Sequence, residues 1–266
     1  MGNPPAHRAR KRFGQNFLHD TSVIHRIVRA VDPKKGDNLV EIGPGQGAIT
    51  LELLPIIGTM QVVELDRDLI EPLARRCGLV GEIRIHNADA LKFDFGSLAL
   101  PDRPLRIVGN LPYNISTPIL FHLLKYADDI KDLHFMLQKE VVDRMAAGPG
   151  SKTYGRLSIM LQAKCEITRL FHIGPGAFNP PPKVGSAFVR LIPHVKPPVQ
   201  IDDETLFAQL VTQAFSQRRK TLRNSLSKIV TPEIIQDAGI DPSIRPEQLP
   251  LAAFAELANL ACKALD

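Results

Sequence analysis

Tryptophan is absent from this sequence of 266 residues, and cysteine occurs only three times. Cys77, Cys165 and Cys262 are odd in number, far apart and without a C-x-x-C pair, which argues against a disulfide framework and against a zinc cluster. We therefore expect reduced thiols packed in the core and no metal site. No apolar run approaches the roughly 18 residues that a membrane-spanning helix needs, and no signal-like segment follows the basic N-terminus. These absences predict a cytoplasmic protein without membrane association.

Negative charge is missing from two basic segments. The whole chain has 33 Lys and Arg against 28 Asp and Glu, which gives a net charge of +5. Four cations precede the first acid, Asp20, and five more lie in an acid-free stretch between Glu204 and Glu233, so the remainder carries 5 − 9 = −4. The cations are Arg8, Arg10, Lys11 and Arg12 in the first segment and Arg218, Arg219, Lys220, Arg223 and Lys228 in the second. Together the two patches predict a polyanionic partner, although either patch alone is compatible with solvated surface cations.

Short apolar runs alternate with longer amphipathic stretches from Asn38 onward. We expect strands at residues 39–42, 61–65, 83–85, 105–108, 133–137 and, later, 188–192. Helices are expected at residues 46–57, 67–77 and 116–125, and an earlier helix that carries Val23 and Ile27 on one face is expected to be capped by Asp20 or Thr21. This alternation predicts a doubly wound α/β fold, in which helices cover both faces of a parallel sheet.

A proline-rich linker separates this part of the chain from a helical part. Residues 193–198 contain three prolines, which cannot continue a strand or a helix. We expect a sheet domain over residues 1–195 and a small helical domain over residues 196–266. The helical domain is expected to contain one basic helix with an inward apolar stripe and an exposed cationic face. The stripe consists of Phe215, Leu222, Leu226 and Ile229, and the cationic face consists of Arg219, Lys220 and Arg223.

A glycine-rich turn follows the first of the strands expected after Asn38. Gly43, Gly45 and Gly47 have the spacing G-x-G-x-G, which lets a ligand approach the backbone closely but differs from the G-x-G-x-x-G spacing of dinucleotide sites. Glu64 lies 64 − 43 = 21 residues later, at the end of the next strand, where a carboxylate can accept both hydroxyls of a ribose. Asp89, next to Ala90, follows the third strand and can accept a hydrogen bond from an adenine amine. Each feature alone suits a tight turn, a helix cap or a surface acid, but together they predict a nucleoside cofactor.

The segment Asn110-Leu111-Pro112-Tyr113 follows the fourth strand at the same edge of the sheet. An aromatic amine is a weak nucleophile because its lone pair is delocalised into the ring. The side-chain oxygen of Asn110 and the carbonyl of Leu111 can accept its two N–H groups and turn the lone pair towards a methyl donor. Pro112 fixes the turn, and Tyr113 offers a face on which a base stacks, worth about 1–3 kcal/mol. An ordinary turn is the alternative for this motif taken alone.

Chemistry on a paired base requires the base to leave the helical stack, so the predicted substrate is a loop or a flipped nucleotide. Phe178, which precedes Asn179 and three prolines, is a candidate for the opposite wall of a base sandwich. The alternative is a loop aromatic that is folded under the prolines.

These motifs resemble those of the small-subunit ribosomal RNA adenine dimethyltransferases, and the resemblance covers nearly the whole chain. It rests on the glycine turn, residues 12–18, 64–66, 87–90, 110–117, 137–141, 154–158, 181–184 and 217–223. The resemblance implies the Rossmann-like fold of class I methyltransferases with a small all-α C-terminal domain. It also implies that S-adenosylmethionine is the cofactor and that two neighbouring adenines in a hairpin near the 3′ end of the RNA each receive two methyl groups. The implied cofactor contacts are Asn16, Leu18, Gly43, Glu64, Asp89 and Asn110.

Two other functions remain open. One is a large-subunit ribosomal RNA adenine methyltransferase of the antibiotic-resistance type, and the other is a ribosome-assembly or transcription accessory factor that acts by binding. Residues 13–18 and 217–223 favour the small-subunit enzyme, and the intact Asn110–Tyr113 motif argues against a purely non-catalytic role. We expect a monomer whose partners are small-subunit ribosomal RNA and the immature small subunit. Its expected RNA contacts are Arg10, Lys11, Arg12, Arg218, Arg219, Lys220 and Arg223.

Overall fold

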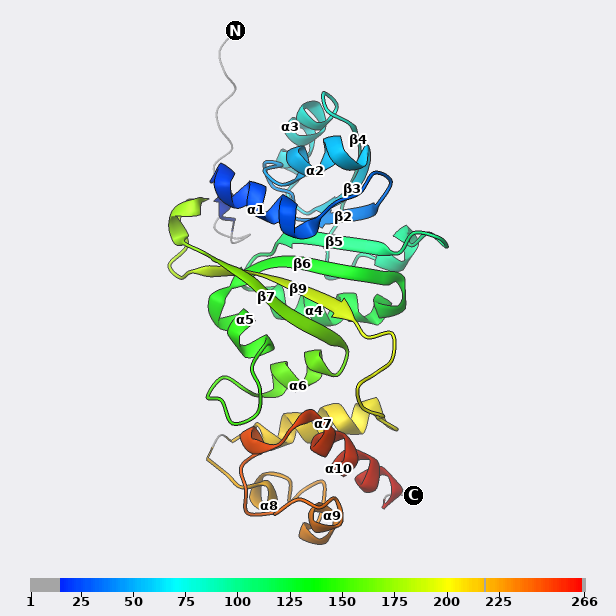
Figure 1. Cartoon of the computed structure of the whole chain (residues 1–266), viewed down its shortest axis with the longest axis vertical. Helices are drawn as coiled ribbons and strands as arrows, with labels where there is room; N and C mark the ends of the chain where they lie inside the picture. Colours follow the sequence, from blue (N-terminus) through cyan, green and yellow to red (C-terminus); the bar gives the residue numbers. More distant parts are fainter. Residues whose placement is uncertain (1–14, 218, 265–266) are drawn as a thin grey trace. The chain divides into compact units, whose positions relative to one another are not determined.

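A computed structural model describes residues 15–217 and 219–264, which form two compact units (Figure 1). The first unit ends at Val142 and also contains Thr168–Pro193, and the second consists of Asp143–Ile167 and the chain from His194 onward. The second break therefore lies close to the expected boundary after residue 195, but residues 143–167 differ from the expectation. They join the second unit because Ile159 and Ala163 are buried in the same apolar cluster as Phe207 and Leu210.

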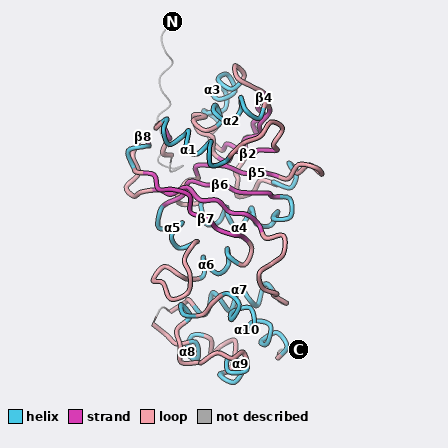
Figure 2. Tube along the Cα trace, viewed as in Figure 1, coloured by secondary structure: helices cyan, strands magenta, loops and turns pink. Residues whose placement is uncertain are grey.

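The first unit is built on a seven-stranded sheet with the order β4-β3-β2-β5-β6-β9-β7. Figure 2 draws its strands in magenta, with helices in cyan around them. Five strands run parallel, and β9 pairs antiparallel with β6, so the α/β class is confirmed as a mixed sheet. The edge strand β7 is missing from the sequence prediction. The strands are β2 (Asn38–Ile42), β3 (Thr59–Glu64), β4 (Glu82–Asn87), β5 (Leu105–Asn110), β6 (Ile130–Gln138), β7 (Cys165–Ile173) and β9 (Ser186–Pro193).

Helices α1 (Thr21–Val31), α2 (Thr50–Ile57) and α3 (Arg67–Cys77) cover one face of β2 and β3. Ile27 of α1, Leu53 of α2 and Leu73 of α3 share one buried cluster with Leu39 and Val62 of the strands. Asp20 caps α1 by accepting from the Ser22 and Val23 N–H groups, as predicted, and α3 has its predicted bounds. The helices along this part of the chain are α1 (Thr21–Val31), α2 (Thr50–Ile57), α3 (Arg67–Cys77), α4 (Ser116–Leu123), α5 (Lys139–Met145) and α6 (Arg156–Gln162).

The second unit is helical, as predicted, but the expected basic helix over residues 215–229 is wrong. Helix α7 ends at Ala214 and α8 has only four residues. The chain breaks there because the Leu222 and Arg223 N–H groups donate to the Ile244 and Pro242 carbonyls instead of to a preceding helical turn. The helices after the linker are α7 (Glu204–Ala214), α8 (Leu222–Ser225), α9 (Pro232–Asp237) and α10 (Leu251–Lys263).

Shorter elements complete the chain. The two-residue strands β1 and β8 pair antiparallel, with Leu18 opposite Phe178. Among the described residues, no helix is long and apolar enough to cross a membrane, and no group of three or more His, Cys, Asp or Glu is arranged to hold a metal. The short elements are β1 (Phe17–Leu18), β8 (Phe178–Asn179) and the 3-10 helices η2 (Phe95–Leu98), η3 (Leu124–Asp129), η4 (Pro175–Ala177) and η5 (Pro246–Gln248).

Candidate functional site

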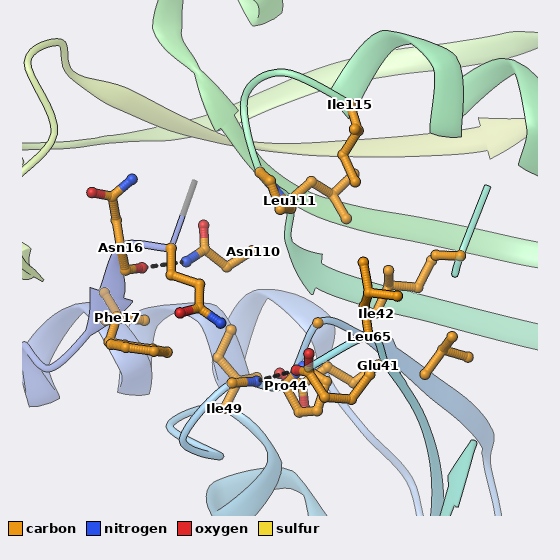
Figure 3. Close-up of a pocket in the computed structure, with 18 of the residues that line it drawn as sticks. Asn16, Phe17, Glu41, Ile42, Pro44, Ile49, Leu65, Asn110, Leu111 and Ile115 are labelled. Carbon is orange, nitrogen blue, oxygen red and sulfur yellow. Dashed lines mark hydrogen bonds between the residues drawn. The ribbon is translucent and has the colours of Figure 1, made fainter. Parts of the chain in front are cut away.

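A cavity of about 210 Å³ lies at the carboxyl ends of β2, β3 and β5, where the sheet order reverses direction (Figure 3). Glu41 and Glu64 point to the same face of the sheet because each lies two residues after a core residue of its strand, Leu39 and Val62. The cavity lining collects most of the predicted site residues. They are Asn16, Leu18, Gly43, Gly45, Glu64, Asp89, Ala90, Asn110, Leu111, Pro112 and Tyr113.

The glycine turn contains three residues with a left-handed backbone, of which Gly43 and Gly45 line the cavity. Gly43, Gly45 and Gly47 have φ values of 67°, 57° and 80°, a region that favours glycine. The Gly43 N–H donates to the Val63 carbonyl over 2.9 Å, which ties the turn to β3. Gly47 was predicted to contact the cofactor but does not line the cavity. A Cβ on Gly47 would lie 2.7 Å from Leu73, so this glycine allows α3 to pack under the turn.

Glu64 is 6% exposed and holds the turn through its carboxylate. Its Oε2 accepts from the Gly45 N–H over 3.1 Å, and its Oε1 accepts from the Asp66 N–H over 2.8 Å. Burial is the main reason that the pKa of Glu64 lies above its usual range. Each carboxylate oxygen keeps a second lone pair, so Glu64 can still accept hydroxyl groups of a ligand.

Glu41 is a cavity residue that sequence reasoning did not assign to the site. It is 1% exposed, and its Oε2 accepts from the Thr50 hydroxyl over 2.6 Å. Burial, followed by the nearby Glu64, raises the pKa of Glu41 to about 8 despite the Thr50 hydrogen bond. The available signal was a carboxyl inside an otherwise apolar strand, directly before the glycine turn. No Lys, Arg or His occurs among the described residues that line the cavity.

Asn110 is held in one orientation at the end of β5. Its Nδ2 donates to the Asn16 carbonyl over 3.0 Å, and Figure 3 shows the amide nitrogen turned towards Asn16. The side-chain oxygen is thereby left as an acceptor. Gly109 is required before it, because a Cβ there would lie 2.6 Å from the Ile42 carbonyl oxygen.

Tyr113 is fixed by a contact that the sequence did not predict. Its hydroxyl lies 2.7 Å from the Oγ of Ser186, a buried residue of β9. Asp89 is half-buried in the lining, and its Oδ1 accepts from the Leu91 N–H over 3.0 Å, as in the alternative of a cap. Both side chains are therefore positioned before any ligand binds.

Phe178 does not lie with these residues. It is 3% exposed, packs in the apolar cluster of the first unit and is absent from the cavity lining. Phe178 pairs with Leu18 in the β1–β8 ribbon, and both side chains belong to this cluster, so the ring packs inward from a short strand instead of from a loop under the prolines. The expected role as a wall of a base sandwich does not fit this position.

The predicted RNA contacts fall into two groups. Arg10, Lys11, Arg12 and Arg218 lie outside the described residues. Arg219, Lys220 and Arg223 are exposed in the second unit, although not on one continuous helix. Leu222 and Leu226 are fully buried beneath them, so the predicted division into inward apolar and outward cationic side chains holds for these residues.

The sequence is similar to that of named proteins over nearly its whole length. The chain matches the ribosomal RNA adenine dimethylase family over residues 6–263. A protein of Pseudomonas putida named ribosomal RNA small subunit methyltransferase A is 58% identical over 259 residues, which cover 97% of each chain. The protein of that name from Pseudomonas aeruginosa is 58% identical over 253 residues, which cover 95% of this chain and 94% of the relative.

Solved structures give the same fold. A dimethyladenosine transferase from Plasmodium falciparum superimposes with a TM-score of 0.77 at 26% identity, covering 91% of this chain and 95% of that chain. The 23S rRNA methyltransferase ErmE superimposes with a TM-score of 0.72 at 23% identity, covering 93% of this chain and 100% of that chain. The latter likeness concerns the fold alone.

Proposed function

The chain belongs to the ribosomal RNA adenine dimethylase family, and we propose that it transfers methyl groups from S-adenosylmethionine to the N6 amines of two adjacent adenines in a hairpin of small-subunit ribosomal RNA. The relatives that are 58% identical over nearly the whole chain support the small-subunit substrate. The main support for the proposal is the Asn110 side-chain oxygen, which is left as an acceptor at the cavity. The described lining of this cavity contains acids and no cation.

The cavity residues fit the cofactor. S-adenosylmethionine supplies a methyl group on a positively charged sulfur, and an acidic lining without cations favours such a ligand. Gly43 and Gly45 let the ligand approach the backbone, and Glu64 accepts the ribose hydroxyls. Asp89 accepts the adenine amine of the cofactor through its second carboxylate oxygen. The family resemblance adds Asn16, Leu18 and Asn110 to this set, and Ala90 lines the same cavity.

Asn110 and Leu111 prepare the target amine. The Asn110 side-chain oxygen and the Leu111 carbonyl accept its two N–H groups, which favours a pyramidal nitrogen whose lone pair faces the methyl donor. The amine becomes acidic once it is methylated, so its proton passes to water and no strong base is needed. Tyr113 stacks on the base, and the Ser186 contact holds the hydroxyl end of its ring.

The helical unit serves RNA binding in this proposal. Arg219, Lys220 and Arg223 are exposed, and the buried Leu222 anchors the segment that presents them. Together with Arg10, Lys11, Arg12 and Arg218, they contact phosphates of the immature small subunit. The protein acts as a monomer in the cytoplasm. The division of labour between a sheet domain for chemistry and a helical domain for RNA binding belongs to this proposal.

A methylation assay tests the function. Purified protein and labelled S-adenosylmethionine are incubated with small ribosomal particles from cells lacking the gene and, separately, with large-subunit RNA. The expected product is N6,N6-dimethyladenosine at two adjacent adenines of the small-subunit RNA, identified by mass spectrometry. Label in the large-subunit RNA alone would establish the antibiotic-resistance type of enzyme, and tight binding to the particles without label would establish an assembly factor.

A further inference from the structure

Glu41 is a buried carboxyl that the proposed reaction does not use. It lies near the end of β2, lines the cavity and is 1% exposed. Its one described hydrogen bond is the 2.6 Å contact from the Thr50 hydroxyl to Oε2. A single neutral donor is weak compensation for a carboxylate that has been removed from water.

Among the residues that the structure describes, no cation raises or lowers the pKa of Glu41. Strand β3 contributes the acid Glu64, helix α3 contributes the Cys77 thiol, and β5 contributes only the neutral Asn110 to the lining. The described lining has no Lys, Arg or His. Burial beside a second carboxyl favours the protonated form. The resulting pKa of about 8 keeps most Glu41 carboxyls neutral at pH 7.

We infer that Glu41 holds a proton in the ligand-free protein and releases it to water when S-adenosylmethionine binds, so that the cavity distinguishes the charged methyl donor from its uncharged-sulfur product, S-adenosylhomocysteine. The inference rests on the proposed function. The donor carries one more positive charge than the product, and the new carboxylate balances that charge. When the methyl group has left the sulfur, the carboxylate takes up a proton again, so one proton is released and one is regained in each cycle.

This coupling makes affinity for the donor depend on pH. Below pH 8, donor binding must displace a proton, so the donor should bind more tightly as the pH rises and should level off above pH 8. S-adenosylhomocysteine has no sulfonium charge, so the affinity for this product should not change over the same pH range. Preference for the donor over the product should therefore increase towards pH 8.

Titration calorimetry on the full chain measures both effects. S-adenosylmethionine and S-adenosylhomocysteine are titrated at pH 6.5, 7.5 and 8.5, each in two buffers with different protonation enthalpies. For wild type we expect about one proton released per donor at pH 6.5 and a roughly fivefold to tenfold fall in the donor Kd from pH 6.5 to 7.5. Glu41→Gln should release no proton and show no such fall. Glu71→Gln, which removes an exposed acid of α3, should behave as wild type.

Thermal unfolding keeps the test independent of ligand binding. Glutamine retains an acceptor for Thr50 and resembles the neutral carboxyl, so Glu41→Gln should fold. In the folded protein the pKa of Glu41 lies above its ordinary value of 4.5. The contribution of Glu41 to wild-type stability is therefore complete below pH 4.5 and is lost as the pH rises through 8. The Tm of Glu41→Gln should therefore exceed that of wild type by a margin that grows from pH 5 to 8. Equal proton release by wild type and Glu41→Gln would overturn the inference, whereas failure of wild type to bind the donor at all would overturn the proposed function itself.

Discussion

The two ends of the central strands differ in whether a cation lies beside their carboxyls. At the start of β5, Arg106 pairs with Asp37 over 2.6 Å and with Asp132 over 2.9 Å. At the other end, Glu41 and Glu64 are more deeply buried than Asp37 and Asp132, but no cation lies among the described lining residues. Burial alone would raise the pKa of Asp37, yet the Lys34 N–H and Arg106 together hold it below its usual range, whereas the pKa of both glutamates is raised. At the start of β5 the carboxylates have a cation within the protein, whereas the carboxyls at the cavity have only neutral hydrogen-bond donors among the described residues.

The largest expected effect comes from breaking the ion pairs of Arg106 at the start of β5. Arg106→Met should lower the free energy of unfolding by about 3–5 kcal/mol, because it leaves Asp132 and Asp37 without their cation and also removes the donor to the Val31 carbonyl. Denaturant unfolding measures this loss. Arg84→Met, at an exposed position of β4, is the matched control and should stay within about 0.5 kcal/mol of wild type. A loss below about 1 kcal/mol in Arg106→Met would mean that the buried ion pairs are not what separates the two ends.

Removing the Glu64 carboxylate from the cavity should reduce ligand binding more than it reduces the free energy of unfolding. Glu64→Ala should weaken S-adenosylmethionine binding by about 1.5–3 kcal/mol, because charge-assisted hydrogen bonds to the ribose are lost. Its unfolding free energy should fall by less than that of Arg106→Met, since the change orphans two backbone N–H groups and no opposite charge. Calorimetry and denaturant unfolding on the same samples give both numbers. Unchanged affinity in a folded Glu64→Ala protein would contradict the ribose role.

Tyr113, a neutral residue of the cavity lining, should affect the methyl-transfer step. Tyr113→Ala should lower single-turnover methylation by the equivalent of about 1–3 kcal/mol, because the base loses its stacking partner. Tyr113→Phe keeps the ring and should retain most activity, although Ser186 loses its hydroxyl partner. Equal losses in the two variants would assign the role to the hydroxyl instead of the ring.

The smallest effect on stability is expected from cations that belong to neither end of the sheet. Arg219, Lys220 and Arg223 are exposed, so their joint replacement by Ala should leave the Tm and the cofactor affinity nearly unchanged. Each phosphate contact that is lost should flatten the log–log salt dependence of RNA binding by roughly one unit. A binding titration across salt concentrations checks this. Identical affinity and slope for wild type and the triple variant would show that these cations are only a solvated surface.

The sequence predicts the elements whose signals are local. Helix α3 has its predicted bounds because Asp66 caps it, and the glycine turn and the strand-end residues line one cavity because parallel strands end at the same edge. Features that depend on pairing were not predictable in the same way. Arg106 meets Asp132 only through the register between β5 and β6, and residues 215–229 break as a helix because a distant loop accepts their N–H groups.

Two further differences come from tertiary burial. The edge strand β7 alternates polar and apolar residues too irregularly for its pattern to mark it as a strand. Phe178 was expected to face a ligand, but its pairing with Leu18 turns the ring into the core. In both cases the chemistry of the residue allowed two environments, and only packing selects between them.

In the proposed reaction Asn110, at the carboxyl end of β5, prepares an adenine amine for methylation. The most direct test of this role is to map N6,N6-dimethyladenosine in the small-subunit ribosomal RNA of cells that lack the gene and carry either the wild-type gene or Asn110→Ala. Wild type should restore two adjacent dimethylated adenines. Asn110→Ala should leave them unmethylated while the purified variant folds and still binds S-adenosylmethionine. Full dimethylation of both adenines by Asn110→Ala would contradict the role of Asn110 in preparing the target amine.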